Sequence, residues 1–271
     1  MSKGMLIDVT RCTACRGCQV ACKQWNDKPG ESTRYSASRT NPPALSARTL
    51  CLLDLRPAER NGEEVKLSFV KLQCMHCIDP ACVSACPVAA LTKEDNGPVV
   101  YHAERCFGCR YCMVSCPFEV PKFEWWKAIP TIQKCQFCFD RIEQGLEPAC
   151  ATACPNDAVV FGERDALLFE AKSRIYRQTG KYVPHVYGER EVGGTAIMYI
   201  SDVPFEKLGL PTNLGEKAYP ENTKLFLLAV PLVLMAWPAL FAGVNALVKL
   251  RERGLREAEQ EAEEGLDGRK N

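Results

Sequence analysis

The longest apolar stretch of the chain lies close to its C-terminal end. Leu225 to Val248 carries no charged side chain over 24 residues, and a lysine brackets it on each side. At about 1.5 Å of helical rise per residue it would reach roughly 36 Å, enough to cross a bilayer core of about 30 Å with some tilt. A buried core helix is the alternative, but the length and the charged brackets argue against it. We predict one transmembrane helix over 223–249 and a charged, solvated tail over 250–271.

Elsewhere the apolar residues come in short runs, which is typical of short strands. Runs at 50–53, 99–101, 158–161 and 193–200 are predicted as strands. Between Glu163 and Thr179 the apolar residues recur at helical spacing, so this segment is predicted as an amphipathic helix.

A polar segment over 26–49 interrupts this pattern. It is rich in Ser, Thr, Pro, Arg and Asn, which is loop composition. We predict a surface insertion that could contact a partner subunit.

The composition of the chain is unusual in one residue type, cysteine. The 271 residues include 17 cysteines and only 3 histidines, with a formal charge of +1 and a hydrophobic share of 46 %. This charge shows no global basic excess of the kind that binds nucleic acid, and the hydrophobic share indicates a folded chain.

A domain of this size can build its core without disulfides, and an odd cysteine count does not suit a purely disulfide framework. Met1 to Thr10 is too short and polar to supply the apolar core of a signal peptide. Metal ligation is therefore the leading interpretation.

Sixteen of the cysteines fall into four groups of four. The first and third groups share the spacing C-x2-C-x2-C-x3-C, whereas the middle gap widens to four residues in the second and to eleven in the fourth. Proline follows the last cysteine of the second, third and fourth groups, and Lys23 takes that place in the first. In chain order the groups are Cys12, Cys15, Cys18, Cys22; Cys74, Cys77, Cys82, Cys86; Cys106, Cys109, Cys112, Cys116; and Cys135, Cys138, Cys150, Cys154.

This spacing is that of a bacterial ferredoxin. A short loop supplies three thiolates to one cubane cluster, and the fourth cysteine ligates the other cluster of a pair. The loop turns backbone N–H groups toward the sulfurs, and proline marks its exit because it fixes φ and donates no N–H. The wider middle gaps only lengthen the loop before the third ligand.

Two other uses of these cysteines are weaker. Four structural zinc sites could also use four thiolates each, but zinc knuckles do not repeat the ferredoxin spacing followed by proline. Disulfides would leave that repeated spacing without a reason. The remaining cysteine, Cys51, lies in an apolar stretch and is predicted as a small buried hydrophobe.

The pairing rule predicts four [4Fe–4S] clusters, each with a full set of cysteines. Site I takes Cys12, Cys15, Cys18 and Cys154; site II takes Cys74, Cys77, Cys82 and Cys116; site III takes Cys106, Cys109, Cys112 and Cys86; site IV takes Cys135, Cys138, Cys150 and Cys22. No catalytic residue is predicted, because holding clusters needs no general acid, base or nucleophile.

The repeat predicts an α+β fold of two nested ferredoxin-like dicluster modules plus the C-terminal transmembrane helix. The four-cluster domain is placed at 1–161, with an inner module at about 70–121 and an outer module formed by 1–69 and 122–161. Residues 162–222 are predicted as a connector to the membrane helix.

Four clusters would also change the charge of the protein. Each oxidised cluster with its thiolates carries about −2, so the formal +1 becomes about −7. Basic residues near the loops could offset this charge locally or be ordinary solvated groups. They are Arg11, Arg16, Lys23, Arg105, Arg110 and Lys134.

The three histidines and two neighbouring tryptophans lie outside the predicted ligand sets. His76 lies inside the second cysteine group, and because that group has a full cysteine set, we predict it beside the cluster or at the surface rather than as a ligand. His102 and His185 belong to no motif. Trp125 and Trp126 could line an interface or an electron path, although such residues more often only pack.

Several segments resemble the iron–sulfur (beta) subunit of membrane-bound respiratory formate dehydrogenases. They are Leu6 to Cys12, Cys18 to Asp27, Cys135 to Pro155 and Gly193 to Thr195, and the resemblance runs through the whole chain, including one transmembrane helix. Similar four-cluster subunits serve membrane-bound nickel–iron hydrogenases and other molybdopterin oxidoreductases. Cys109 to Val114 and Val203 to Leu208 look nearer to the hydrogenase relatives.

The resemblance implies an electron-transfer subunit without catalysis of its own. In such complexes a molybdenum or tungsten bis-pterin subunit oxidises formate, and electrons pass through four clusters to a quinone-reducing membrane subunit, often with haem b. The alternative is the equivalent subunit of a nickel–iron hydrogenase or another molybdopterin oxidoreductase. A ferredoxin-like anchor that faces the cytoplasm and feeds a soluble reductase is a third hypothesis. The predicted helix has no histidine, so no haem of its own is expected.

Sidedness is predicted from the charges that flank the helix. Lys249, Arg251, Arg253 and Arg256 follow the span, whereas only Lys217 and Lys224 lie at a similar distance before it. The positive-inside rule then favours a cytoplasmic C-terminus and a cluster domain on the extracytoplasmic side of the cell membrane. The resemblance implies export of the folded subunit together with a partner that carries a twin-arginine signal.

Overall fold

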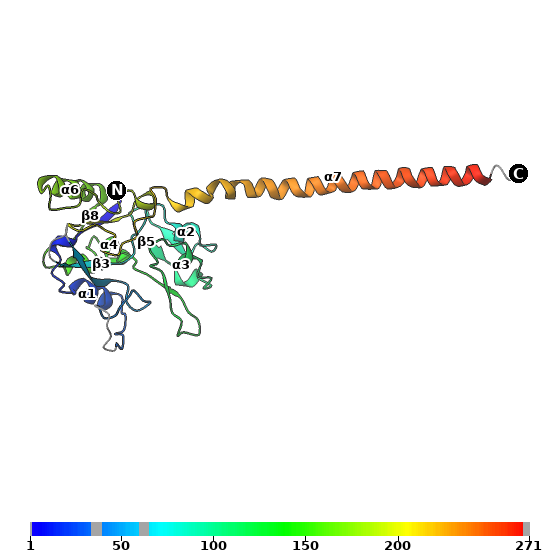
Figure 1. Cartoon of the computed structure of the whole chain (residues 1–271). Helices are drawn as coiled ribbons and strands as arrows, with labels where there is room; N and C mark the ends of the chain where they lie inside the picture. The colour runs from blue at the N-terminus through cyan, green and yellow to red at the C-terminus, as the bar shows by residue number, and fades with distance from the viewer. Residues whose placement is uncertain (1, 34–39, 60–64, 268–271) are drawn as a thin grey trace. The chain divides into compact units, whose positions relative to one another are not determined.

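The computed structural model describes residues 2–33, 40–59 and 65–267. The chain divides into two units, Met1–Pro220 and Glu221–Asn271 (Figure 1). The first unit mixes helices and strands, and the second consists of helix alone, as the predicted α+β fold with a long apolar C-terminal helix requires.

A three-stranded sheet organises the first unit. Its central strand β1 (Lys3–Asp8) pairs antiparallel with β8 (Val159–Glu163) and parallel with β9 (Ile197–Ile200). Met5 and Ile7 join the larger apolar core, whereas Leu6 joins a second cluster under helix α6 (Arg164–Arg177). Since side chains alternate along a strand, β1 is buried on both faces, which explains its nearly continuous apolar run.

The segment predicted as a connector contributes to this unit. The amphipathic helix is confirmed as α6, whose Leu167 and Ala171 are buried, and the strand after the glycine turn is confirmed as β9. Because β9 pairs directly with β1, residues 162–220 complete the central sheet. The folded unit therefore extends to Pro220 rather than ending at residue 161.

Three two-stranded antiparallel ribbons surround the sheet. They are β2 (Leu52–Glu59) with β3 (Val65–Leu72), β4 (Leu91–Lys93) with β5 (Val99–Tyr101), and β6 (Lys122–Phe123) with β7 (Ile132–Gln133). The predicted strand at 50–53 begins at Leu52. In the predicted insertion, the described residues between Asp27 and Thr49 form neither helix nor strand.

The remaining helices are short and lie close to the cysteines. They are α1 (Gly17–Trp25), α2 (Ala81–Ser84), α3 (Tyr111–Ser115), α4 (Phe139–Glu143) and α5 (Ala149–Thr152), with single turns of 3-10 helix at η1 (Val9–Arg11), η2 (Ala103–Arg105) and η3 (Glu191–Gly193).

The second unit is the helix α7, which runs from Tyr219 to Asp267. Its stretch Tyr219–Glu257 has a mean hydropathy of 2.3 over its most apolar window, so it is long and apolar enough to cross a membrane. The helix is longer than the predicted span. The charged tail extends it because Glu, Ala, Arg and Leu are strong helix formers.

Candidate metal centres

Short helices carry the third cysteine of every group. Cys18 lies in α1, Cys82 in α2, Cys112 in α3 and Cys150 in α5, and the fourth cysteine of each group follows four residues later. The helices pack in pairs, α1 against α5 and α2 against α3. Each pair thereby brings the end of one cysteine group toward the loop of the other.

The contact between α1 and α5 is close enough to require glycine. A Cβ atom on Gly17 would lie 2.9 Å from the carbonyl oxygen of Ala153, which real Cβ contacts essentially never show. Gly17 precedes Cys18, and Ala153 precedes Cys154. The absence of a side chain at residue 17 therefore lets cysteines from the first and fourth groups approach each other.

Cavities mark two of the predicted ligand sets. One cavity is lined by Cys12, Cys15, Cys18 and Cys154, the four cysteines assigned to site I. A second is lined by Cys86, Cys106, Cys109 and Cys112, the four assigned to site III. In both sites the fourth thiol comes from the partner group, as in a paired ferredoxin.

The electrostatic interactions between thiols indicate which cysteines lie together at site II. Burial raises the pKa of the Cys77 thiol, and its neighbours Cys74, Cys116 and Cys82 raise it further. Three of these residues belong to the second group, and Cys116 belongs to the third. The structure thus brings together the four cysteines that the pairing rule assigns to site II.

Site IV is assembled from the fourth group and α1. Burial raises the pKa of Cys135, to which Cys138 and Cys150 also contribute. Cys22 of α1 lies in the same apolar core as Cys150. The helix packing described above accounts for its approach to this set.

The loops between the cysteines contain residues with left-handed backbone conformations. Ala14 and Arg16 have φ of 61° and 60° in the first group, and Gly108 and Arg110 have φ of 80° and 63° in the third. Such residues turn successive N–H groups toward one concave side of the loop, a nest that suits anions and occurs in many iron–sulfur sites.

Two backbone N–H groups, one of them in such a loop, contact cysteine sulfur directly. The amide of Phe137, itself at φ 62°, donates to Cys135 Sγ at 3.3 Å, and the amide of Ala90 donates to Cys86 Sγ at 3.2 Å. Amide donors stabilise thiolate charge, and a metal centre also favours deprotonated thiols. Because each set combines four thiols with such loops, the residues present fit a cubane cluster.

A site for a single metal ion would need at least three ligating side chains close together. Among the side chains described, which are those of residues 2–33, 40–57 and 67–257, no three of His, Cys, Asp or Glu are close enough together to hold one ion.

The four sets are also neighbours in a definite order. Cys74 of site II contributes to the raised pKa of Cys135 of site IV, after burial. Burial likewise raises the pKa of Cys82 of site II to about 12, with Cys112 of site III contributing. Cys18 of site I and Cys22 of site IV both hydrogen-bond the thiol of Cys51. The neighbour relations therefore run I–IV–II–III.

Exposure distinguishes the two ends of this order from its middle. Cys15 of site I and Cys109 of site III are exposed, whereas the cysteines of site IV are buried. Aromatic residues near site III are also exposed, including Tyr111 at 57 % and Trp125 at 65 %. Trp125 and Trp126 are also at the surface: Arg110 lies over Trp125, which packs edge-on against Phe123, and Arg48 lies over Trp126.

Two buried lysines lie among the sites, and the sequence pattern singled out only one. Lys134 donates to the carbonyl oxygens of Val99 and Cys135, so it is a buried group and not a solvated one. Lys71 is also 2 % exposed and lines the site I cavity. Its position on β3 gave no signal, because a lysine in a strand usually faces water.

His76 is fully buried in the second loop. Its Nδ1 accepts a hydrogen bond from the amide of Val99 at 3.0 Å, and its ring stacks on Phe137. Burial, followed by the charges of Lys134 and Lys93, holds its pKa well below the usual value, so the ring is neutral. The histidine is a packing and hydrogen-bonding residue beside site II.

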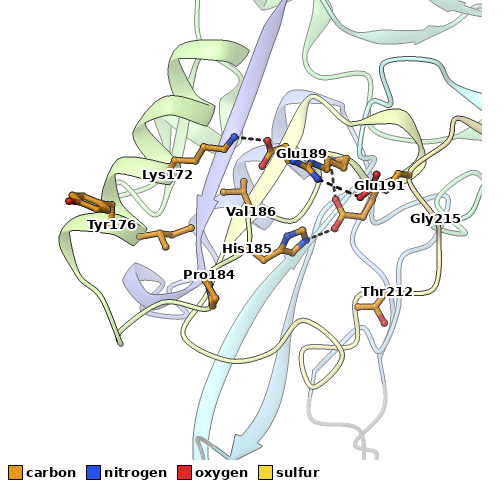
Figure 2. Close-up of a pocket in the computed structure, with 12 residues that line it drawn as sticks. Lys172, Tyr176, Pro184, His185, Val186, Glu189, Glu191, Thr212 and Gly215 are labelled. Carbon is orange, nitrogen blue, oxygen red and sulfur yellow. Dashed lines mark hydrogen bonds and ion pairs between the residues drawn. The ribbon is translucent and has the colours of Figure 1, made fainter.

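A large surface cavity lies away from the cysteines. It has a volume of about 680 Å³, and Figure 2 shows its charged groups from α6 and from the loop that follows it. Lys172 pairs with Glu189 at 2.6 Å, and His185 Nε2 lies 2.6 Å from Glu191 Oε1. No cysteine lines this cavity, so it has no part in the candidate centres.

Comparisons with known proteins agree with this chemistry. A family model described as a 4Fe-4S dicluster domain matches residues 65–164. The chain is 35 % identical over 283 residues to the hydrogenase-2 operon protein HybA of Escherichia coli O157:H7, covering 92 % of this chain and 84 % of that protein. It is 39 % identical over 214 residues to the nitrate-inducible formate dehydrogenase iron–sulfur subunit of Escherichia coli K12, covering 76 % and 71 %. A protein of Nitratidesulfovibrio vulgaris is 42 % identical over 266 residues, covering 96 % and 70 %.

Proposed function

The chain belongs to the family of iron–sulfur electron-transfer subunits of formate dehydrogenase- and hydrogenase-type complexes, and from this premise we propose that it holds four [4Fe–4S] clusters between a catalytic subunit and a membrane subunit. The family and the 4Fe-4S dicluster chemistry are established by the comparisons above. The number of clusters, their ligands and the partners are the proposal.

The sixteen grouped cysteines are the proposed ligands. Site I is held by Cys12, Cys15, Cys18 and Cys154, site II by Cys74, Cys77, Cys82 and Cys116, site III by Cys106, Cys109, Cys112 and Cys86, and site IV by Cys135, Cys138, Cys150 and Cys22. When bound, each cluster would accept and give up one electron at a time. The thiols fix where the clusters lie, and the loop amides favour the thiolate charge.

One observation supports the relay most directly, namely the neighbour order I–IV–II–III with an exposed cysteine at each end. Cys15 and Cys109 make the terminal sites accessible to other proteins, whereas the buried cysteines of site IV shield the middle of the row from solvent. An electron-transfer subunit between two partners needs this arrangement, with two accessible ends and a protected interior.

The proposed catalytic partner is a molybdopterin subunit, with molybdenum or tungsten, that oxidises formate. The proposed acceptor is an integral-membrane subunit that reduces quinone, with or without haem b. The similarity to the formate dehydrogenase iron–sulfur subunits, at 39 % identity, supports this assignment.

A hydrogenase complex is the second candidate. The match to the hydrogenase-2 operon protein covers 92 % of this chain, against 76 % for the formate dehydrogenase subunit. The additional coverage supports a nickel–iron hydrogenase, or another molybdopterin oxidoreductase, as the alternative source of electrons.

The proposed location is the cell membrane, with α7 as the single span. The lysine and arginine residues after the helix support a cytoplasmic C-terminus and an extracytoplasmic cluster domain. Protease added to intact spheroplasts should then cleave the cluster domain. Protection of that domain until the cells are lysed would overturn this orientation.

Purification of the native complex from membranes tests the function itself. Iron and labile-sulfide analysis should give about sixteen iron atoms per chain, and fewer would overturn the four-cluster proposal. Formate should then reduce the clusters, as seen by EPR, and a molybdopterin subunit should co-purify. Reduction by hydrogen but not by formate would establish the hydrogenase alternative instead.

A further inference from the structure

The junction between sites I and IV contains two buried groups that are not predicted ligands. Cys51 lies in the same apolar core as Cys18 of site I and Cys22 of site IV, and its thiol accepts a hydrogen bond from Cys18 and donates one to Cys22. These two ligands lie one turn apart on α1, and Cys51 is 2 % exposed. Cys51 therefore contacts one ligand of each neighbouring site.

Lys71 reaches the same junction from β3. It lines the site I cavity together with Cys18 and Cys154, and its strand position is opposite Leu53 in the β2–β3 ribbon. Its ammonium group interacts electrostatically with the thiols of Cys18 of site I and Cys150 of site IV, as well as with Cys51. Its charge therefore acts on ligands of both sites.

The surroundings of Lys71 fix its ammonium group in place. Its Nζ donates to Gln73 Oε1 and lies 3.9 Å from Met5 Sδ, while Tyr199 Oη donates to its carbonyl oxygen at 2.6 Å. Among the described residues, no carboxylate forms an ion pair with Lys71. A buried cation without a carboxylate is expensive unless some other negative charge compensates it.

Negatively charged clusters at sites I and IV would supply that compensation. Reduction adds further negative charge to a cluster, and a fixed cation in a buried site is little screened by salt. A thiol that donates to a ligand sulfur acts in the same direction, because it stabilises the charged form.

We propose that Lys71 and Cys51 are positioning residues of the I–IV junction, which together favour the reduced state of the two clusters that they separate. Lys71 provides a fixed positive charge to both sites, and Cys51 provides an S–H donor without being a ligand. This inference rests on the proposed occupancy of sites I and IV. It implies that electrons entering the row are held preferentially at this junction.

EPR-monitored redox titration of the purified complex tests the proposal. The signals are first assigned to sites with Cys15→Ser for site I and Cys138→Ser for site IV. Lys71→Met should then make reduction at sites I and IV about tenfold less favourable, about 59 mV lower for a one-electron couple, with the iron content unchanged. Lys71→Arg, which keeps the charge, should remain close to the wild type.

A matched lysine variant distinguishes a specific effect of Lys71 on sites I and IV from the general effect of removing a lysine near a cluster. Lys93 donates to the carbonyl oxygen of Cys77 at 2.9 Å and is close to site II. Lys93→Met should leave the signals of sites I and IV unchanged. Equal shifts at all four sites in Lys71→Met, or no shift at sites I and IV, would overturn the proposal.

Cys51→Ala provides a second route if Lys71→Met loses iron. The Cys51→Ala variant should retain the wild-type iron content. It should lower the reduction potentials of sites I and IV, but by a smaller amount than Lys71→Met does. Unchanged potentials would overturn the role of Cys51. Loss of about four iron atoms in Cys51→Ala would make it a ligand and also contradict the proposal. An iron content below about sixteen in the wild-type chain would instead overturn the proposed function.

Discussion

Arg174 Nη1 lies 3.2 Å from Oδ2 of Asp8, although the two residues are 166 positions apart. Asp8 is the last residue of β1 and is 1 % exposed, and the same oxygen accepts a hydrogen bond from Tyr182 Oη at 2.9 Å. Since η1 and Cys12 follow directly, this ion pair connects α6 to the start of the site I loop. It explains why the segment after residue 161 is part of the folded unit.

Asp8→Asn should therefore destabilise the first unit. The substitution removes the buried carboxylate shared by Arg174 and Tyr182, so that Arg174 keeps only its pairing with Glu170 at 2.8 Å. Loss of a hydrogen bond between charged groups costs about 2 kcal/mol. The apparent thermal midpoint of the detergent-solubilised complex, followed by circular dichroism, should fall by several degrees.

An exposed ion pair on the same helix provides the control. Lys172 pairs with Glu189 at 2.6 Å, but its side chain is 53 % exposed, so Lys172→Met should change the midpoint very little. Equal midpoints for Asp8→Asn and the wild type would show that the Asp8–Arg174 pair does not hold α6 on the sheet.

The exchange of ligands between groups makes a second prediction. Cys154 closes site I and Cys150 belongs to site IV, although both come from the fourth group. Cys154→Ser should thus remove the same EPR signal as Cys12→Ser, whereas Cys150→Ser should remove the signal that Cys135→Ser removes. If Cys154→Ser and Cys150→Ser affected one common signal, the four cysteines of the fourth group would bind a single cluster.

The seventeenth cysteine makes a third prediction, about iron content. Cys18→Ser should lose about four of sixteen iron atoms, because a full cubane depends on its complete ligand set. Cys51→Ser should keep all of them, since Cys51 is not a ligand in this assignment and only hydrogen-bonds Cys18 and Cys22. Equal iron losses in the two variants would mean that the ligand assignment at the I–IV junction is wrong.

The cysteine spacing made the candidate centres predictable, because a short loop with fixed ligand intervals encodes its geometry locally. The structure brings Cys154 to Cys12 across 142 positions only through the packing of α1 on α5, yet the general pairing rule of ferredoxins anticipates that contact.

The roles of Lys71 and residues 162–220 could not be predicted in this way. The burial of Lys71 depends on which face of β3 meets η1, and the pairing of β9 with β1 joins segments about 190 residues apart. Neither leaves a local periodicity, so the sequence does not single out Lys71 and predicts the segment that contains β9 as a connector. Such non-local contacts are decided by tertiary packing rather than by local sequence preference.

A fourth prediction concerns α7. Its apolar side chains are exposed in the chain, including Leu225 at 81 % and Phe226 at 71 %, and burial in lipid would remove that surface from water. A chain that ends at Pro220 keeps the whole first unit and should retain its iron. Washing membranes with alkaline carbonate should release this truncated chain but not the full-length protein.

A chain lacking only 258–271 keeps the apolar stretch and should resist the wash, because the charged tail contributes nothing to insertion. Resistance of the Pro220 truncation itself would mean that contacts of the first unit, and not α7, anchor the protein.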